Sequence, residues 1–242
     1  MTITLKINKS QALGSISTKE FKDLQKLLKT KGFILRKPYQ SDGIKWMVKR
    51  ERSSRPFGLL CDEPGLGKTL QTIATLMVNQ KPRTLIAVPT CVLTQWKDTL
   101  ETLIPGKTFL FHGPERPHRA TLLRNILKHK TIVLTTIGLL FNRDDADTKT
   151  TLQKLRWDRL VIDECHFLRN PKTQTFQGAM MIRAPIRWGL TGTPIQNSKR
   201  DIKTLFEFIG ATGKLKTLIQ FHLLRRTKEQ MAKMDPTLAL PP

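Results

Sequence analysis

The sequence lacks the long hydrophobic segments of a membrane protein. Charged residues interrupt each apolar run well before the ~18 consecutive apolar residues that identify a spanning helix. The amino-terminal stretch MTITLKINKS has no apolar core of the kind found in secretory signal peptides. We therefore expect an intracellular protein without a membrane partner, not a secreted one. The sequence leaves a nucleus, a virus-infected cell and a virion open as locations.

Cysteine and histidine are also scarce, and neither forms a metal-binding pattern. The three cysteines, Cys61, Cys91 and Cys165, lie 30 and 74 residues apart, which is not a zinc-ligand spacing. In an intracellular protein we expect them to be reduced thiols. Of the five histidines, only His166 lies within a motif. A zinc domain is therefore not expected.

Acidic residues are few compared with basic ones. The chain has 42 Lys and Arg residues against 19 Asp and Glu residues, which gives a formal net charge of +23. The excess is spread along the chain and does not gather in a tail, so the folded body itself is positive. Such a surface attracts polyanions, of which nucleic acid is the commonest. Plain solubility is the alternative explanation.

Short apolar runs alternate with helical stretches from residue 57 onward. The runs occupy residues 57–61, 84–89, 108–113, 131–136, 159–164 and 187–192. Apolar strands that alternate with helices predict an α/β fold, in which helices cover both faces of a parallel sheet. Before the first run we expect two helices. The first has capping-box spacing at Ser17 and Glu20, and the second begins near Gln40.

A glycine-rich stretch, GLGKT (65–69), follows the first apolar run and opens a helix. Glycines allow the backbone to wrap closely round a phosphate, so that several N–H groups point at it. Lys68 would then reach the β- and γ-phosphates, and the Thr69 hydroxyl would bind magnesium. Asp62 stands where the strict pattern G-x-x-x-x-G-K-[ST] has its first glycine. A simple glycine turn between strand and helix is therefore the alternative.

Two carboxylates end the fifth apolar run, in RLVIDECH (159–166). A phosphate loop needs a carboxylate at the end of a neighbouring strand to hold magnesium, and Asp163 suits that role. Glu164 would polarise the attacking water as a general base. His166 would sense the γ-phosphate or connect the site to the next motif. An acidic turn that caps a helix is the alternative.

A third motif, LTGTPIQN (190–197), follows the last apolar run. Thr191, Gly192 and Thr193 lie at its strand end. Small hydroxyl residues at this point would hydrogen-bond both the acidic pair and moving parts of the protein. Taken alone, such a string is most often only a turn.

Four stretches in a fixed order point to a known family. DEPGLGKTLQ, DECHFLRNPKTQTF, LTGTPIQN and LLRRTK together resemble the first ATPase lobe of Swi/Snf-type DNA translocases, in helicase superfamily two. The resemblance runs from about Arg36 to the end of the sequence. It implies a single RecA-like phosphate-loop domain over residues 36–242 that binds ATP and Mg²⁺. Residues 1–35 would form an N-terminal extension with one helix.

The resemblance and the chemistry above together assign roles to individual residues. The resemblance implies that Gln40 would read the edge of the adenine base. The expected catalytic residues are Lys68, Asp163, Glu164 and His166. The expected nucleotide-binding residues are Gln40, Gly65, Leu66, Gly67, Lys68, Thr69 and Leu70, and the expected magnesium ligands are Thr69 and Asp163. The implied nucleic-acid contacts are Pro89, Trp96, Thr135, Arg169 and Asn170. The coupling residues would be Thr191, Gly192 and Thr193.

The sequence also departs from the family pattern. The family resemblance implies a second lobe that supplies arginine fingers, in a motif like Q-x-x-G-R-x-x-R, and no such string occurs here. An arginine finger contributes ~10³–10⁵ to turnover in related phosphoryl transfer. We therefore expect hydrolysis to need a second lobe from another chain. Cys165 replaces a small residue of the family, and we expect a buried thiol there.

Two main functions follow from these patterns. The first is the ATP-binding half of a Swi/Snf-like ATPase, which hydrolyses ATP with magnesium to act on duplex DNA. The second is a nucleic-acid-binding module with residual nucleotide binding and no independent turnover. A single-lobe ATPase of another type, acting in a ring, is a third function, but the stretch LRNP (168–171) after the acidic pair opposes it.

Overall fold

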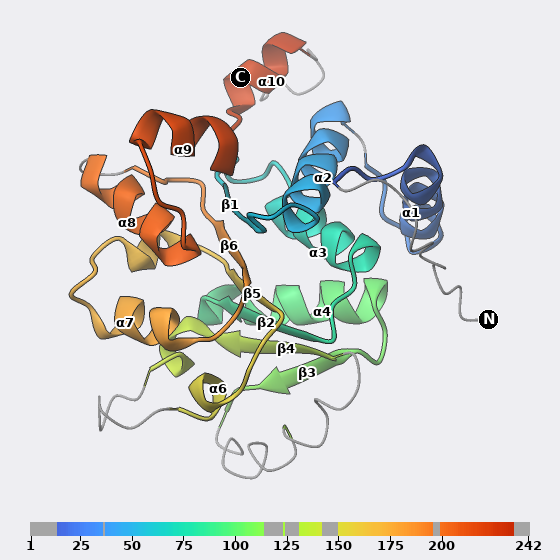
Figure 1. Ribbon diagram of the computed structural model, residues 1–242. Coiled ribbons are helices and arrows are strands. Elements are labelled where there is room, and N and C mark those ends of the chain that lie inside the picture. The colour runs from blue at the N-terminus through green and yellow to red at the C-terminus, as the bar shows by residue number, and fades with distance from the viewer. Residues whose placement is uncertain are drawn as a thin grey trace.

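A parallel sheet runs through the centre of the computed structural model (Figure 1). The structure describes residues 14–35, 37–113, 123, 131–141, 150–195 and 199–234. The strands in these ranges are β1 (Phe57–Leu60), β2 (Arg83–Val88), β3 (Thr108–Phe111), β4 (Thr131–Thr136), β5 (Arg159–Ile162), β6 (Ile186–Leu190) and β7 (Leu223–Leu224). Their order is β3-β4-β2-β5-β6-β1-β7, and every neighbouring pair is parallel.

All six predicted strands are present, each within two residues of its expected bounds. The seventh, β7, was not predicted, because a two-residue strand is too short to show any periodicity. The helices are α1 (Thr18–Thr30), α2 (Pro38–Glu51), α3 (Lys68–Val78), α4 (Leu93–Leu103), α6 (Thr151–Lys154), α7 (Gln174–Met181), α8 (Lys199–Ile209), α9 (Leu215–His222) and α10 (Lys228–Met234).

Helices cover both faces of the sheet, as the apolar strands predicted. One core cluster joins Leu59, Leu85 and Leu160 of the strands to the helices α6 to α9. A second cluster, on the opposite face, joins Leu60 and Ile86 to the helices α1 to α4. Because side chains alternate across a strand, neighbouring residues such as Leu59 and Leu60 enter different cores. The α/β fold with two covered faces is confirmed.

Helix α1 begins at the predicted capping box. The Ser17 hydroxyl accepts a hydrogen bond from the Glu20 backbone N–H at 3.2 Å, and the Glu20 carboxylate accepts one from the Ser17 N–H at 2.8 Å. Leu24 and Leu28 are buried in the same core cluster as residues of α2 and α3. The helix of the predicted N-terminal extension therefore packs into the core, while the domain boundary at residue 36 stays a prediction.

A fully buried ion pair fixes α2 to the sheet. The Arg159 Nε donates to the Glu51 carboxylate at 2.6 Å, and a second guanidinium nitrogen contacts the other carboxylate oxygen. The Trp188 indole and the Asn79 amide also donate to Glu51, at 2.9 and 2.6 Å. This network holds two helices and two strands together at the end of the sheet where the strands begin.

None of the helices in the described ranges is long and apolar enough to span a bilayer.

Candidate nucleotide-binding site

The predicted motifs gather at one edge of the sheet. Since every strand is parallel, the residues that follow the strands all lie at the carboxyl edge. The glycine loop follows β1, Asp163 follows β5 and Thr191 follows β6, which lies between those two strands. Residues distant in the sequence are thereby brought to one side of the molecule, which is where ligands bind in open α/β sheets.

The phosphate loop requires its glycines. Gly65 and Gly67 have φ angles of +87° and +79°, in the left-handed region that side chains disfavour. A Cβ on Gly67 would also lie 2.7 Å from the Gln40 amide nitrogen. Loop and α2 therefore meet, so the predicted adenine-reading Gln40 lies directly against the predicted phosphate cradle.

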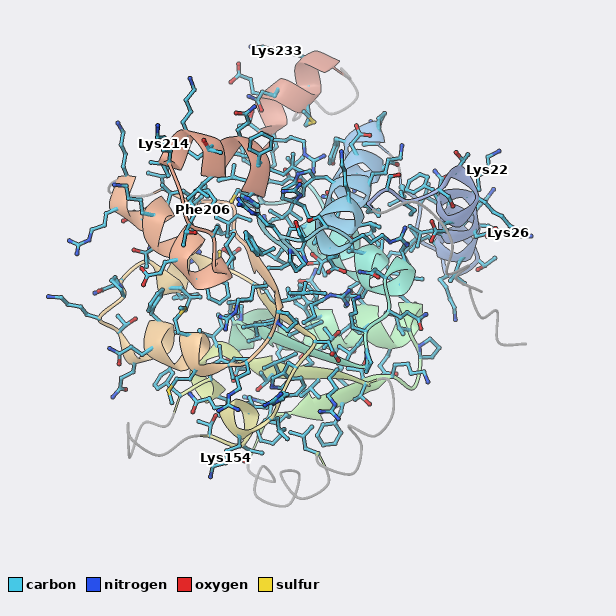
Figure 2. All side chains as sticks on the ribbon, in the orientation of Figure 1. Lys22, Lys26, Lys154, Phe206, Lys214 and Lys233 are labelled. Atoms are coloured by element: carbon cyan, nitrogen blue, oxygen red, sulfur yellow. The ribbon has the colours of Figure 1, made fainter. Side chains whose placement is uncertain are left out.

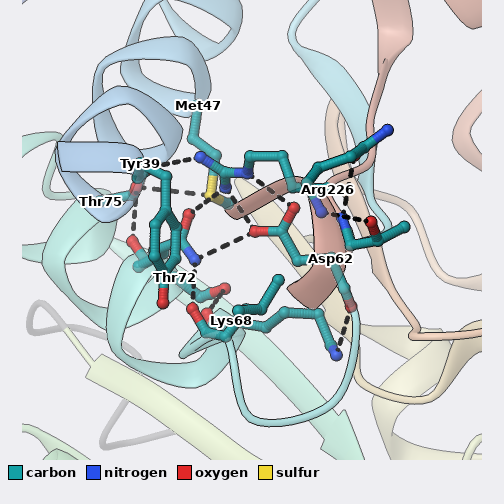
Figure 3. A network of polar contacts seen from close by, with 11 residues as sticks. Tyr39, Met47, Asp62, Lys68, Thr72, Thr75 and Arg226 are labelled. Carbon is teal, nitrogen blue, oxygen red and sulfur yellow. Dashed lines mark hydrogen bonds and ion pairs between the residues drawn. The ribbon is translucent and has the colours of Figure 1, made fainter. Parts of the chain in front are cut away.

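Lys68 lies at the start of α3 and points across this loop. Its Nζ donates to the backbone carbonyl of Asp62 at 2.8 Å (Figure 3). Burial raises the pKa of the Asp163 carboxyl, and the positive charge of Lys68 is one of the smaller influences that oppose this rise. Lys68 is thus within electrostatic range of the second motif. Thr69 follows it on α3, at the same edge of the sheet.

The two carboxylates of the acidic pair have different surroundings. Asp163 is buried, accepts from the Trp96 indole N–H at 2.7 Å and accepts from the Glu164 N–H at 3.0 Å. Burial raises the pKa of Asp163, and the bond from Trp96 opposes part of that rise. Such a carboxylate is held in one orientation, as a metal ligand needs to be.

Glu164 is held by residues from two motifs. Its backbone has a φ of 48°, and it is the one residue other than glycine with a positive φ in the part of the chain that the structure describes. His166 Nδ1 lies 2.9 Å from its carboxylate, and the Thr191 hydroxyl donates to the same oxygen at 3.3 Å. Backbone conformations of this kind often occur at functional positions. The acidic motif and the threonine motif therefore converge on one carboxylate oxygen.

Gly192 connects the threonine motif to the phosphate loop. A Cβ at this position would lie 2.7 Å from Pro64 Cδ, so the two segments touch closely because residue 192 has no side chain. Beside it, the Thr193 N–H donates to the Thr191 hydroxyl at 3.2 Å. The three predicted coupling residues are all described, whereas residues 196–197 at the end of the motif 190–197 lie outside the described residues.

The predicted nucleic-acid contacts divide into two groups. Trp96 and Thr135 have exposed fractions of 1% and 0%, and the Thr135 hydroxyl donates to the Phe111 carbonyl at 2.8 Å. In this conformation neither side chain has surface to offer a polyanion, and their role as nucleic-acid contacts stays a prediction. Trp96 instead shares the buried face of α4 with the leucines of that helix. Its spacing from Leu93 and Leu100 is a sequence signal of burial.

The other three predicted contacts are accessible. Pro89 and Arg169 are half-buried and Asn170 is exposed. The Arg169 Nε donates to the His166 carbonyl at 2.8 Å, which places its guanidinium beside the acidic motif. These residues keep the surface that a contact with nucleic acid requires.

The structure also reveals a buried polar network that the sequence did not predict. Asp62 accepts from the Arg226 Nε at 2.9 Å and from the Gln71 amide at 3.2 Å, and Arg226 donates to Gln71 at 2.8 Å and to the Tyr39 carbonyl (Figure 3). Two sequence features belong to this network. One is the aspartate that replaces the usual first glycine of the phosphate loop, and the other is the stretch LLRRTK, for which the sequence predicted no role.

Two features of the site bear on whether a nucleotide and magnesium would fit there. The Gln40 Oε1 is buried and has no hydrogen-bond partner within the described part of the chain, so it is an acceptor in need of a donor. The described residues contain no group of three or more His, Cys, Asp or Glu side chains placed so that they could hold a metal ion. Magnesium is normally held by one or two protein ligands with phosphate oxygens and water. Thr69 and Asp163 suit that pattern.

The fold and this site define the class. A glycine loop between a strand and a helix, beside an acidic pair at the end of a nearby parallel strand, is the arrangement of a RecA-like phosphate-loop domain. The comparison with known families then gives the particular one. The chain belongs to the SNF2-related domain family, whose model matches residues 39–228.

Individual relatives agree with this family. The DNA excision repair protein ERCC-6-like of Bos taurus is 33% identical in an alignment of 193 residues, and the match covers 76% of this chain and 15% of that protein. The Helicase-like transcription factor of Homo sapiens is 32% identical in an alignment of 193 residues, and the match covers 68% of this chain and 19% of that protein. The chain thus spans about a fifth or less of the length of these relatives.

A solved structure also matches the fold. The Sulfolobus solfataricus SWI2/SNF2 ATPase core in complex with dsDNA is 29% identical to this chain, with a TM-score of 0.64. The match covers 82% of this chain and 46% of that one. The RecA-like fold and the Swi/Snf resemblance predicted from the sequence are therefore confirmed.

Proposed function

We propose that this chain is the ATP-binding half of an SNF2-family, DNA-dependent ATPase, which hydrolyses ATP with magnesium and acts on duplex DNA. The observation that carries the proposal is the convergence of Lys68, Asp163 and Glu164 at one edge of the sheet. It is supported by the family match and by a related core whose structure contains dsDNA. We further propose that it acts inside the cell, together with a second ATPase lobe.

Each residue has a role in this proposal. Lys68 leaves the Asp62 carbonyl and binds the β- and γ-phosphates. Bound magnesium, held by Thr69 and Asp163, would neutralise charge on the phosphates. The Glu164 carboxylate, oriented by His166 and Thr191, accepts a proton from the attacking water.

The phosphate loop and the general base are tested by two substitutions. We expect Lys68→Ala to lose nucleotide affinity by about tenfold or more, because a charge-assisted contact to the phosphates is removed. Glu164→Gln should keep the affinity and lose turnover by ~10²-fold or more, because an amide accepts no proton. Binding of a fluorescent ATP analogue gives the first quantity. Phosphate release with duplex DNA and a second-lobe protein gives the other. Equal loss of binding in both variants would contradict these roles.

A second function is favoured by the charge of +23. In this alternative the chain is a nucleic-acid-binding module that retains nucleotide binding without turnover. Lysine side chains project from several separate elements, including Lys22 and Lys26 of α1, Lys154 of α6 and Lys233 of α10 (Figure 2). Turnover that stays at background with duplex DNA and every candidate second lobe, together with DNA binding, would favour this alternative.

A further inference from the structure

Arg226 joins three parts of the nucleotide site that are far apart in the sequence. It lies 164 residues from Asp62, 155 from Gln71 and 187 from Tyr39, and its guanidinium contacts all three. It is 9% exposed, and its guanidinium carbon lies 5.2 Å from the centre of the Tyr39 ring. One side chain therefore holds together the start of α2 at Tyr39, the entrance of the phosphate loop at Asp62 and helix α3 at Gln71.

The fit around this guanidinium is close. A Cβ on Gly43 of α2 would lie 1.8 Å from the Gln71 amide oxygen and 2.8 Å from an Arg226 nitrogen. Residue 43 therefore has to be glycine if α2 is to rest on the network. Both carboxylate oxygens of Asp62 have donors, so the buried charge is fully paired.

The backbone around Arg226 is also tied to the phosphate loop. The Cys61 N–H donates to the Leu224 carbonyl at 2.6 Å, and the Glu63 N–H donates to the Arg226 carbonyl at 3.0 Å. The Glu63 carboxylate accepts from the Lys228 N–H at 2.8 Å, where α10 begins. The loop entrance and the segment 223–234 thus form one hydrogen-bonded unit.

We propose that Arg226 is a positioning residue that links occupancy of the phosphate loop to the segment 223–234, which forms β7 and α10. The inference rests on the proposed nucleotide binding. Lys68 holds the Asp62 carbonyl in the structure, and a phosphate that draws the ammonium away removes that bond. Arg226 still binds the Asp62 carboxylate, so a shift of the loop at residue 62 is transmitted through Arg226 to β7 and α10.

The test compares hydrogen exchange of residues 223–234 with and without a non-hydrolysable ATP analogue and magnesium. In the wild type we expect slower exchange of this segment when the analogue is bound. In Arg226→Gln we expect about tenfold weaker binding, as for the loss of a hydrogen bond to a charged group. At saturating analogue its exchange in residues 223–234 should no longer respond. Arg226→Lys keeps the charge and should restore part of the response.

Two further variants keep the result decisive. Arg55→Gln removes an exposed arginine outside the network, and it should behave like the wild type. If Arg226→Gln does not fold, Asp62→Asn/Arg226→Gln removes both buried charges and is measured instead. If exchange of residues 223–234 responds to the analogue in the Arg226 variants as it does in the wild type, this inference is overturned and the proposed function is unaffected. If none of the Arg226 variants folds, the role of Arg226 is structural only and the inference fails. A wild type that binds no analogue would overturn the proposed function as well.

Discussion

At the scale of single residues, the site depends on side chains that hold other side chains. Trp96 was expected at the nucleic-acid surface, yet it is buried and its indole N–H binds Asp163 at 2.7 Å. Glu164 is similarly held by His166 and Thr191. Such supporting contacts often affect a metal site nearly as much as the ligands themselves.

Replacing Trp96 by phenylalanine tests this supporting role. Trp96→Phe keeps an aromatic ring in the core and removes the donor to Asp163, so we expect magnesium-dependent nucleotide binding to weaken by about tenfold. Magnesium titration of the bound fluorescent analogue measures the change. Trp157→Phe is the matched control, because Trp157 is also buried and its indole N–H donates to the Leu152 carbonyl of α6, at 2.9 Å, instead of to Asp163. Equal effects of the two changes would contradict the role of Trp96.

Cys165 is a buried thiol, as the sequence predicted. It is fully buried, and burial raises its pKa, while burial raises the pKa of Cys61 to about 12. Both thiols therefore stay protonated and lie outside the proposed chemistry. Cys91 is exposed.

At the scale of secondary-structure elements, α2 connects the candidate nucleotide site to the far end of the sheet. Its first turn carries Tyr39 and Gln40, and its last residue is Glu51, which pairs with Arg159 at the start of β5. The helix is therefore fixed at both ends by buried polar contacts. Its position on the sheet is set by charges as well as by apolar packing.

The buried pair can be compared with an accessible one on the next residue. Glu51→Ala leaves Arg159 charged and unpaired in the core, so we expect a loss of ~3–5 kcal/mol in the free energy of unfolding. Arg52→Ala breaks the partly exposed pair with Glu20, at 2.8 Å, and should cost less than ~1 kcal/mol. Denaturant unfolding of both variants measures the difference. Similar losses would show that Glu51 contributes little beyond a surface pair.

His222 gives the contact between α9 and β1 a pH dependence. Burial lowers the pKa of His222 below its usual 6.5, and the charges of Arg50 and Arg55 add to the effect. The unfolded chain therefore binds the proton more readily than the folded chain. The contribution to stability is complete above pH ~6.5 and is lost as the pH falls below that value.

A non-titrating residue at this position should remove that dependence. We expect Tm to fall between pH 7.5 and 5.5 by less in His222→Gln than in the wild type. Thermal unfolding at the two pH values is the measurement. An unchanged difference between wild type and variant would assign the pH dependence to other groups.

At the scale of the whole molecule, the charge of +23 is spread along the sequence and does not gather in a tail. Basic side chains project from helices on both faces of the sheet (Figure 2). The accessible residues Arg169 and Asn170 lie just after the acidic motif, at the carboxyl edge. A polyanion at this edge would be close to the proposed nucleotide site.

Binding of duplex DNA should therefore depend strongly on salt. Each neutralised phosphate adds about −0.9 to the slope of log K against log salt, so three contacts would weaken binding roughly fortyfold between 50 and 200 mM salt. Fluorescence anisotropy of labelled duplex DNA across this range measures the slope. A salt-insensitive complex would contradict an interface made of phosphate contacts.

The sequence by itself determined six of the seven strands in the described residues, the first helix and the residue types of the motifs. Apolar runs of five or six residues, the Ser17–Glu20 capping box and the glycine loop are local patterns, and local patterns follow from the periodicity and backbone preferences of neighbouring residues. The family resemblance could be read for the same reason. It depends on short stretches such as DECHFLRNPKTQTF and their order.

Only the tertiary structure decided which distant residues meet. The sheet order places β7 beside β1, and this brings Arg226 onto Asp62 across 164 residues of sequence. The packing of α4 likewise turns Trp96 inward onto Asp163. No local pattern contains these contacts, because strand order is set by how the whole chain buries its apolar surface, and a charge is tolerated inside only where that order supplies its partner.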